Sequence, residues 1–227
     1  NRRYLSVLME SALMKAEQND RRVGVFFVDV DNFKNINDTM GHAFGDEVLA
    51  AIAQLLSSTA RTFGFAARLG GDEFTVVLAE LDDPRDAMRA AKNIVEAMRL
   101  PFVVEGRELF VTISLGISLF PDDGDDSETL MVNADVAMYR AKELGRDNFQ
   151  WFAAEMNVMA RERMELEWHL RYAMQLGQLS LAYQPQCNAA GEVLAFEALM
   201  RWQHPTLGAV SPSRFIPMAE DSSLIIS

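Results

Sequence analysis

Two short acidic clusters contain the residues of this chain that are most suited to chemistry. The first, RLGGDEF at residues 68–74, places Asp72 and Glu73 directly after Gly70 and Gly71. Apolar runs flank it on both sides, and a glycine pair between strand-like runs predicts a hairpin whose tip presents both carboxylates. An ordinary solvated turn is the alternative interpretation, because acidic residues are common at turns.

The second cluster, VDVDNFKNINDTMGHAFGD at residues 28–46, begins where a continuous apolar run ends. Asp29 and Asp31 are expected on one face of the end of this strand, with Val30 on the other. If the strand runs beside the hairpin, Asp29 and Asp72 can share a cation, completed by water and phosphates, as is typical of magnesium on a nucleotide. Capping or turn formation is the alternative, but two adjacent acidic pairs would repel each other without a cation.

Three further polar residues of the second cluster are suited to a nucleotide. Lys34 can meet a phosphate, and Asn37 and Asp46 can read the edge of a base. Together the two clusters favour a site for a metal ion and a nucleotide.

The composition limits the classes of protein to which the chain can belong. Its 227 residues are 49% hydrophobic, enough for one large domain or one and a half ordinary ones. The net charge of −12 argues against a nucleic-acid partner, which would require a basic face. Cys187 is the only cysteine, so no internal disulfide can form and a cytoplasmic location is expected. No apolar run approaches the roughly 20 residues needed to cross a membrane, and no signal peptide is expected.

Helical and strand-like patterns alternate along residues 1–152, which predicts an α/β sheet with flanking helices. The apolar run at residues 23–28 predicts a central strand buried on both faces. Asp46 is expected to cap a helix, and Gly145 to end the last helix of this region. Further elements are expected as helices at residues 84–99 and from 125–127 onward, and as strands at residues 102–104, 109–120 and 148–152.

The character of the chain changes after residue 152. Residues 155–175 are charged and rich in methionine, which predicts a connector helix, and a new strand-like run begins at Leu179. The chain is therefore divided into a domain at residues 1–152, a connector at residues 153–178 and the opening of a second domain at residues 179–227.

Residues 1–152 resemble the GGDEF domain of diguanylate cyclases. The resemblance rests on separate motifs in the same order, namely NRRYL, DVDNFKNINDTMGHAFGD, RLGGDEF, TISLGIS and ADVAMYRAKELGRDNF. It implies a ferredoxin-like sheet, similar to the palm of nucleotide cyclases and polymerases. It also implies that two GTP molecules are condensed into cyclic di-GMP with release of pyrophosphate, one GTP in each domain of a homodimer.

The resemblance further implies roles for individual residues. Asp29, the backbone carbonyl of Val30 and Asp72 are expected to bind Mg²⁺ or Mn²⁺, Asp72 to accept the proton of the attacking 3′-hydroxyl, and Glu73 to support the metal site. Substrate contacts are expected from Gly70, Gly71, Phe33 and Lys34 at the phosphates, Asn37 and Asp46 at the guanine, and Lys142 and Arg146 at the terminal phosphates.

The last two of these residues, Lys142 and Arg146, are expected one helical turn apart on one face, where they would clamp the phosphates. A basic helix end that complements the helix dipole is the alternative interpretation of the pair, and both can hold together.

Residues from about 165 onward resemble the start of an EAL domain, the phosphodiesterase that linearises cyclic di-GMP. The matching segments are AYQPQ and FEALMRWQHPTLGAVSPSRFIPMAE. The resemblance implies the first strands of a truncated TIM-barrel-like domain, with Glu197 as a metal ligand and Gln184 and Arg201 in contact with substrate. A surface acid is the alternative for Glu197. Because the family's other acidic ligands come later, this piece is expected to hydrolyse nothing by itself.

A degenerate inhibitory site is expected shortly before the RLGGDEF motif. Many GGDEF domains carry an Arg-x-x-Asp motif there, which binds the product as an inhibitor, but this chain has Arg61 with Gly64 in place of the acid. A solvated charge at a helix end is the alternative for Arg61. Weak product inhibition is therefore expected, and Gly64→Asp is expected to strengthen it.

The resulting hypothesis is a diguanylate cyclase domain joined to the first part of a phosphodiesterase domain, from a bifunctional bacterial signalling protein. The chain is expected to be a fragment of a parent with an upstream sensor domain, which could anchor that parent to a membrane. A catalytically silent GTP-binding module that controls the neighbouring phosphodiesterase is the alternative hypothesis.

Overall fold

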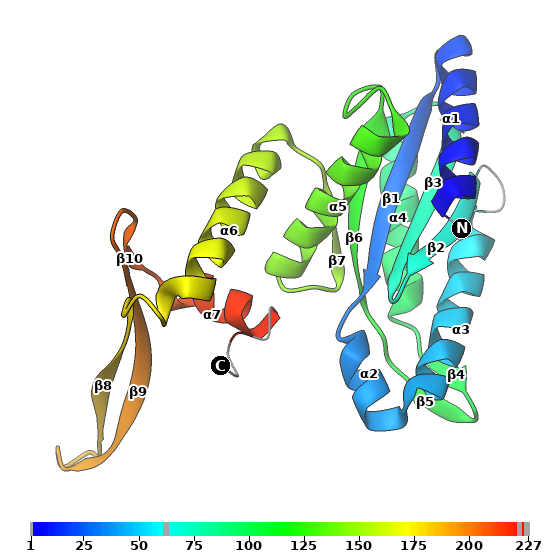
Figure 1. Cartoon of the computed structure of the whole chain (residues 1–227). Coiled ribbons are helices and arrows are strands. Elements are labelled where there is room, and N and C mark those ends of the chain that lie inside the picture. The colour runs from blue at the N-terminus through cyan, green and yellow to red at the C-terminus, as the bar shows by residue number, and fades with distance from the viewer. Residues whose placement is uncertain (1, 61–63, 222–223, 225–227) are drawn as a thin grey trace. The chain divides into compact units, whose positions relative to one another are not determined.

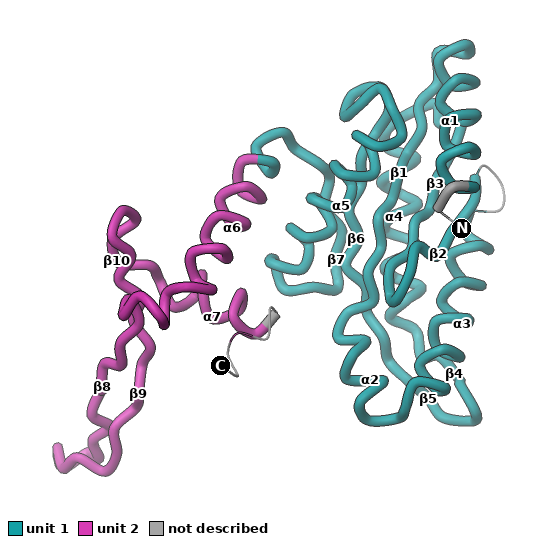
Figure 2. The backbone as a smooth tube through the Cα atoms, viewed as in Figure 1, with its two compact units in different colours: residues 1–157 teal, residues 158–227 magenta. Residues whose placement is uncertain are grey.

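The computed structural model describes residues 2–60, 64–221 and 224. It divides into two compact units, residues 1–157 and residues 158–227, which are coloured separately in Figure 2. Each unit has a hydrophobic core of its own. The division falls within the helix α6 (Ala154–Ala173), where the sequence predicted a connector.

The first unit is built on a five-stranded sheet with the order β2-β3-β1-β6-β7. The central strand β1 (Arg22–Val30) pairs antiparallel with both of its neighbours, whereas β6 and β7 are parallel. Every residue of β1 from Val23 onward is buried, which confirms the predicted central strand. The other strands are β2 (Gly64–Gly70), β3 (Glu73–Leu81), β6 (Ile113–Phe120) and β7 (Asn148–Trp151).

Helices cover both faces of this sheet (Figure 1). Alternate residues of β1 point to opposite faces, so Phe26 and Val28 pack with α3 and α4 whereas Val25 and Phe27 pack with α1 and α5. These layers confirm the expected α/β fold. The helices are α1 (Arg2–Gln18), α2 (Phe33–Met40), α3 (His42–Ala60), α4 (Pro84–Met98) and α5 (Ser127–Glu143), and β4 (Phe102–Val104) pairs with β5 (Arg107–Leu109) in a separate hairpin.

Two expectations about element boundaries are wrong. The helix α3 begins at His42, directly after Gly41 with a φ of 88°, so Asp46 lies inside the helix and does not cap it. The strand expected at residues 109–120 is two strands, because β5 pairs with β4 whereas β6 pairs with β1. The sequence pattern shows that this segment stays apolar, but it does not show that the pairing partner changes from β4 to β1.

The second unit contains a three-stranded antiparallel sheet with the order β10-β9-β8. Its strands are β8 (Leu179–Cys187), β9 (Val193–His204) and β10 (Gly208–Val210), followed by α7 (Pro212–Asp221). Trp202 is buried in its core, and the indole N–H donates to Gln178 Oε1 at 3.1 Å. The other core residues come from α6, β10 and α7, and are Leu166, Leu170, Ala173, Val210, Phe215 and Met218.

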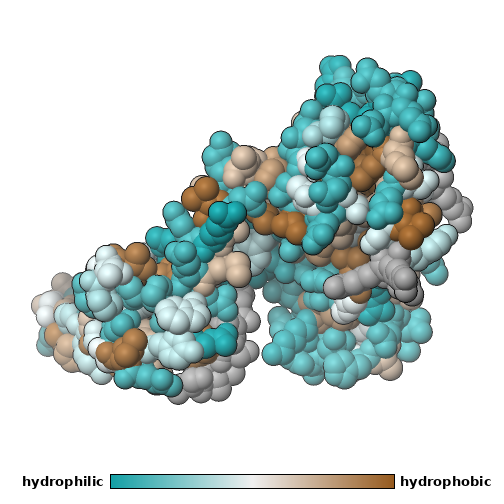
Figure 3. Space-filling view, turned by 45° about the horizontal axis from the view of Figure 1, so that its top comes forward, coloured by the Kyte–Doolittle hydropathy of each residue, from teal (hydrophilic) through white to brown (hydrophobic). Residues whose placement is uncertain are grey.

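The surface seen in Figure 3 is mainly hydrophilic, with separate apolar patches. None of the helices in the described part of the chain is both long and apolar enough to cross a membrane. The continuous apolar run of the sequence, which forms β1, is instead buried between the two helical layers.

Gly64 has a packing role that the sequence pattern did not indicate. It pairs with Leu78 at the start of β2, and a Cβ atom built on it would lie 1.8 Å from the carbonyl oxygen of Val77. A backbone oxygen in a paired strand cannot move aside as a flexible side chain can, so an aspartate here would push β2 away from β3. The expectation that Gly64→Asp strengthens product inhibition is therefore revised. Arg61, the other residue of the degenerate site, lies outside the described residues.

We predict that Gly64→Ala lowers the thermal unfolding midpoint of the chain by about 2–10 °C, because overpacking of this kind costs about 1–3 kcal/mol. Circular dichroism measures the midpoint. Gly124→Ala is the matched control, since the atoms nearest to a Cβ there belong to the side chains of Thr129 and Leu130 and not to a paired backbone, and it should shift the midpoint less. Equal midpoints for wild type and Gly64→Ala would contradict the packing role.

Candidate functional site

The end of β1 and the tip of the β2–β3 hairpin meet at one end of the sheet. Asp29 of β1 pairs in register with Glu73 of β3. The amide of Val30 donates a hydrogen bond to the carbonyl oxygen of Asp72, at 3.3 Å. The two acidic clusters therefore lie side by side at this end of the sheet.

The glycine pair at the tip leaves its backbone accessible. Gly71 is left-handed with a φ of 53°, and, apart from the adjacent residues of the chain, no described heavy atom lies within 4 Å of a Cβ built on Gly70 or Gly71. Arg68 supports the turn, since its Nε donates to the carbonyl oxygen of Gly71 at 2.8 Å. A ligand can approach such a backbone closely, which is the property that a phosphate contact requires.

Asp29 is a buried carboxylate with a cationic partner. Its exposed fraction is 7%, and Lys142 Nζ of α5 lies 2.8 Å from its Oδ1. Burial raises the pKa of Asp29 to about 6, while the hydrogen bond and charge of Lys142 lower it and the charges of Asp72 and Asp31 raise it. A divalent cation would relieve the mutual repulsion of these carboxylates.

The donor set fits a Mg²⁺ or Mn²⁺ ion that is shared with a nucleotide. Asp29, Asp72 and the carbonyl of Val30 offer hard oxygen atoms, and Mg²⁺ commonly takes one or two carboxylates together with substrate phosphates and water. Among the described residues, no group of three or more His, Cys, Asp or Glu side chains could hold a metal ion. A metal bound here would therefore need further ligands from the substrate.

The residues expected at the guanine lie on α2 and α3. These helices pack on the face of β1 that bears Val28 and Val30, opposite to the face that bears Asp29. Asn37 Oδ1 is buried, has no hydrogen-bond partner in the described structure, and lies against Gly45, where a Cβ would be 2.0 Å away. Asp46 follows Gly45 and is exposed. A buried amide oxygen without a partner is costly, and a bound polar ligand would satisfy it.

The two residues expected along the phosphates differ in exposure. Lys34 on α2 is exposed and can reach a ligand. The ring of Phe33 is buried in the hydrophobic core, so Phe33 can contact a phosphate only through its backbone.

Lys142 and Arg146 do not lie one turn apart on a helix, contrary to the prediction. The helix α5 ends at Glu143, and Arg146 lies in the following loop with a φ of 62°. Gly145, with a φ of 107°, ends the helix as glycine commonly does, and the Arg146 amide then donates to the carbonyl oxygen of Ala141 at 3.1 Å. Two different backbone elements therefore position the two cations.

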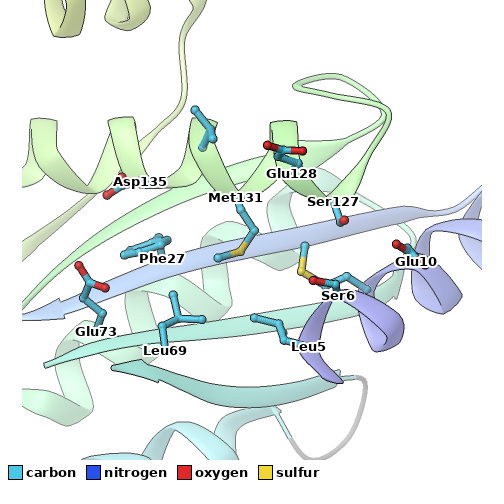
Figure 4. Close-up of a pocket in the computed structure, with 12 residues that line it drawn as sticks. Leu5, Ser6, Glu10, Phe27, Leu69, Glu73, Ser127, Glu128, Met131 and Asp135 are labelled. Carbon is cyan, nitrogen blue, oxygen red and sulfur yellow. The ribbon is translucent and has the colours of Figure 1, made fainter. Parts of the chain in front are cut away.

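A groove of about 590 Å³ lies between α1 and α5, and Figure 4 shows Glu73 and Asp135 at one end of it. Desolvation raises the pKa of Asp135, and the charge of Glu73 raises it further, whereas Lys142 lowers it. Asp135 was not predicted as a site residue, although its spacing of seven residues from Lys142 places both on one helix face. The apolar lining comes from Leu5, Met9, Phe27, Leu69, Met131 and Val132.

The three residues expected in the EAL portion lie on one face of the β8–β9 hairpin. Gln184 pairs in register with Glu197, and Arg201 pairs with Ser180. Side chains alternate along a strand, so Glu197 and Arg201 point to the same side as Gln184. The β8–β9 hairpin alone therefore places these three side chains on one face, and no later strand of a barrel is needed for this.

Comparison with known proteins decides the family. A family model described as diguanylate cyclase, GGDEF domain, matches residues 1–148. The chain belongs to the GGDEF family. A second model, described as EAL domain, matches residues 168–227, so the GGDEF domain is followed by the start of an EAL domain.

The relatives of this GGDEF chain include proteins of cyclic di-GMP signalling. It is 41% identical over 227 residues to the bifunctional diguanylate cyclase/cyclic di-GMP phosphodiesterase MucR of Pseudomonas aeruginosa. The aligned region is 100% of this chain and 33% of MucR. It is 40% identical over 227 residues to the cyclic di-GMP phosphodiesterase PdeR of Escherichia coli, and here the aligned region is 100% of this chain and 34% of PdeR. The chain thus spans about a third of the length of these curated relatives.

A solved GGDEF domain shares the fold of the first unit. The crystal structure of the GGDEF domain of YfiN from Pseudomonas aeruginosa is 38% identical to this chain, with a TM-score of 0.65. The match covers 67% of this chain and 96% of the YfiN domain, which confirms the expected fold.

The raised pKa of Asp29 predicts a pH-dependent stability difference. The folded pKa of about 6 exceeds the ordinary value of 3.8. Stability from this group is therefore present at acid pH and lost as the pH rises through about 6. Asp29→Asn does not ionise, so its stability relative to wild type, without metal or nucleotide, should rise by about 3 kcal/mol between acid and neutral pH.

Urea unfolding at several pH values measures this difference. Asp125→Asn is a suitable control for the substitution itself, because Asp125 is an exposed aspartate in the loop before α5. Parallel stability curves for Asp29→Asn and wild type would mean that the Asp29 carboxylate is not perturbed by burial.

Proposed function

We propose that the GGDEF domain of this chain is a diguanylate cyclase, which condenses two GTP molecules into cyclic di-GMP with the help of Mg²⁺ or Mn²⁺. The observation that carries the proposal is the buried Asp29, which lies beside Asp72 at an accessible glycine turn and within 2.8 Å of Lys142. Membership of the GGDEF family and the likeness to MucR, which is named a bifunctional cyclase and phosphodiesterase, support it.

The acids at the end of β1 and at the hairpin tip carry the chemistry in this proposal. Asp29, Asp72 and the carbonyl of Val30 would hold the metal ion, whose positive charge would favour ionisation of a hydroxyl and departure of pyrophosphate. Asp72 accepts the proton of the attacking 3′-hydroxyl, and Glu73 adds negative charge that supports the cation. Each 3′-oxygen bonds to the α-phosphorus of the other GTP while the bond to pyrophosphate breaks, so two pyrophosphates leave.

The remaining site residues bind and orient the substrate. Asn37 offers its unsatisfied amide oxygen to the guanine edge, together with the exposed Asp46. The open backbone of the glycine turn and Lys34 lie along the phosphates. Lys142 and Arg146 bind the terminal phosphates from α5 and from the loop behind it, since cations pair strongly with phosphate oxygens.

Ring closure requires a second copy of the site. One domain presents one set of nucleotide-binding residues, whereas the product contains two nucleotides, so two GGDEF domains must meet with their sites facing each other. The proposal therefore includes a homodimer, and the rate per chain should rise with protein concentration.

A GTP-binding regulatory module is the second candidate function. The observation that favours it is the likeness to PdeR, which is named a phosphodiesterase and matches the whole of this chain. In that case the GGDEF domain would bind GTP and act on the EAL domain of a parent protein without forming product. GTP binding without turnover at any protein concentration would support this function over the cyclase.

We predict that Asp72→Asn abolishes cyclic di-GMP synthesis, to below a few per cent of the wild-type rate, because it removes a metal ligand and proton acceptor. The fold should stay near wild type, since Asp72 lies in a turn. Product is measured by liquid chromatography after incubation with GTP and Mg²⁺, with Asp125→Asn as the control. Substantial synthesis by a folded Asp72→Asn chain would exclude the proposed role.

Base selection gives a second test. Asn37→Ala should raise the Kd for GTP and reduce discrimination against ATP, because a hydrogen bond to a base edge contributes about 0.5–1.5 kcal/mol. Calorimetric titration of both nucleotides measures the change. Asn35→Ala, which changes an exposed residue of the same helix, is the control. An unaltered Kd for GTP would remove Asn37 from the guanine pocket.

A further inference from the structure

The loop that carries Arg146 has an unusual backbone conformation. Arg146 and Asp147 are consecutive non-glycine residues with positive φ values, 62° and 51°. Residues with a Cβ atom adopt this region at a cost in free energy, so surrounding contacts must hold the loop in this form. Asn148 supplies some of them, since its Nδ2 donates to the carbonyl oxygens of Ala141 and Arg146 at 2.9 and 2.8 Å.

Two residues from distant parts of the chain hold Asp147. The Asp147 amide donates to Asp31 Oδ2 at 3.1 Å. Arg99, at the end of α4, donates from Nε to both carboxylate oxygens of Asp147, at 2.9 and 3.0 Å, and from Nη2 to its carbonyl oxygen, at 3.0 Å. Asp147 is therefore bound through its amide, its side chain and its carbonyl group.

Asp31 differs from Asp29 in what surrounds its carboxylate. Its exposed fraction is 5%, and it also accepts hydrogen bonds from Thr112 Oγ1 at 2.8 Å and from Ser114 Oγ at 2.7 Å. Both oxygens of Asp31 thus face donors from β6, from the segment before it and from the Arg146 loop. Asp29 instead lies next to Asp72 and the cation of Lys142.

We propose that Asp31 and Arg99 are positioning residues, which hold Asp147 and thereby place the neighbouring Arg146 guanidinium at the terminal phosphates of GTP. The inference rests on the proposed function, because that function brings a triphosphate to Arg146. Asp31 on this account is not a metal ligand, although it lies two residues from Asp29. It connects the strand end that bears the acids to the loop that bears the phosphate-binding cation.

The test uses the full 227-residue chain, Mg²⁺ and two probes. One probe is the α,β-methylene analogue of GTP, whose bridging bond is not cleaved, and the other is GMP, which lacks the terminal phosphates. Asp31→Ala and Arg99→Ala should raise the Kd for the analogue about tenfold, as expected for a lost charged contact, and the Kd for GMP less than about twofold.

A conservative variant separates geometry from charge. In Asp31→Asn, Oδ1 can still accept from Asp147 and Thr112, while Nδ2 can donate to the hydroxyl of Ser114. The Kd of Asp31→Asn for the analogue should therefore stay within about threefold of wild type. Arg89→Ala is the matched control, because Arg89 pairs with Asp86 on α4 and not with the Arg146 loop, and it should change neither Kd.

Three results of the binding measurements would overturn the inference. They are an equal loss of affinity for both probes in Asp31→Ala, an unchanged affinity for the analogue, and an Asp31→Asn variant as impaired as Asp31→Ala. Hydrogen exchange of the Asp147 amide supplies a readout that needs no nucleotide, and it should be at least about tenfold faster in Asp31→Ala than in wild type. A wild-type chain that binds neither probe would refute the proposed function, whereas unchanged exchange would refute the anchor itself.

Discussion

The burial of carboxylates at one end of β1 constrains much of the first unit. Asp29 and Asp31 are both almost fully buried, and a buried charge must be paired or hydrogen-bonded. The structure meets this requirement with Lys142 from α5 and with hydroxyl and amide donors around Asp31. The helix α5 and the loop behind it must therefore return to this end of the sheet, and β7 follows directly from that loop.

The sequence predicted the parts of this arrangement that depend on local pattern. The apolar run before Asp29 could only be accommodated where both faces of a strand are covered, and β1 is that strand. The glycine pair predicted the hairpin because Gly71 has a φ that other residues rarely adopt. Once both elements were placed, the proximity of Asp29 and Asp72 followed from adjacent strand ends.

Other features could not be predicted, because they depend on which segments pair in three dimensions. Gly64 and Gly71 are the same residue type, yet Gly71 is needed for its conformation and Gly64 for the approach of a neighbouring strand. The spacing of Arg146 from Lys142 suits a helix, and although Gly145 was expected to end that helix, the sequence did not show that the Arg146 amide turns back to Ala141 beyond the helix end. Hydrophobic periodicity contains no information about such contacts.

The position of Lys142 ties metal binding to phosphate binding in the proposed cyclase. Without ligands its ammonium group lies 2.8 Å from Asp29, where it offsets part of the cost of a buried charge. A divalent ion at Asp29 would take over that compensation and leave the ammonium group free to pair with a terminal phosphate. A phosphate that drew Lys142 away first would leave Asp29 uncompensated, and so would strengthen the attraction for a cation. Each ligand thus favours the other, since coupling between two binding events is reciprocal.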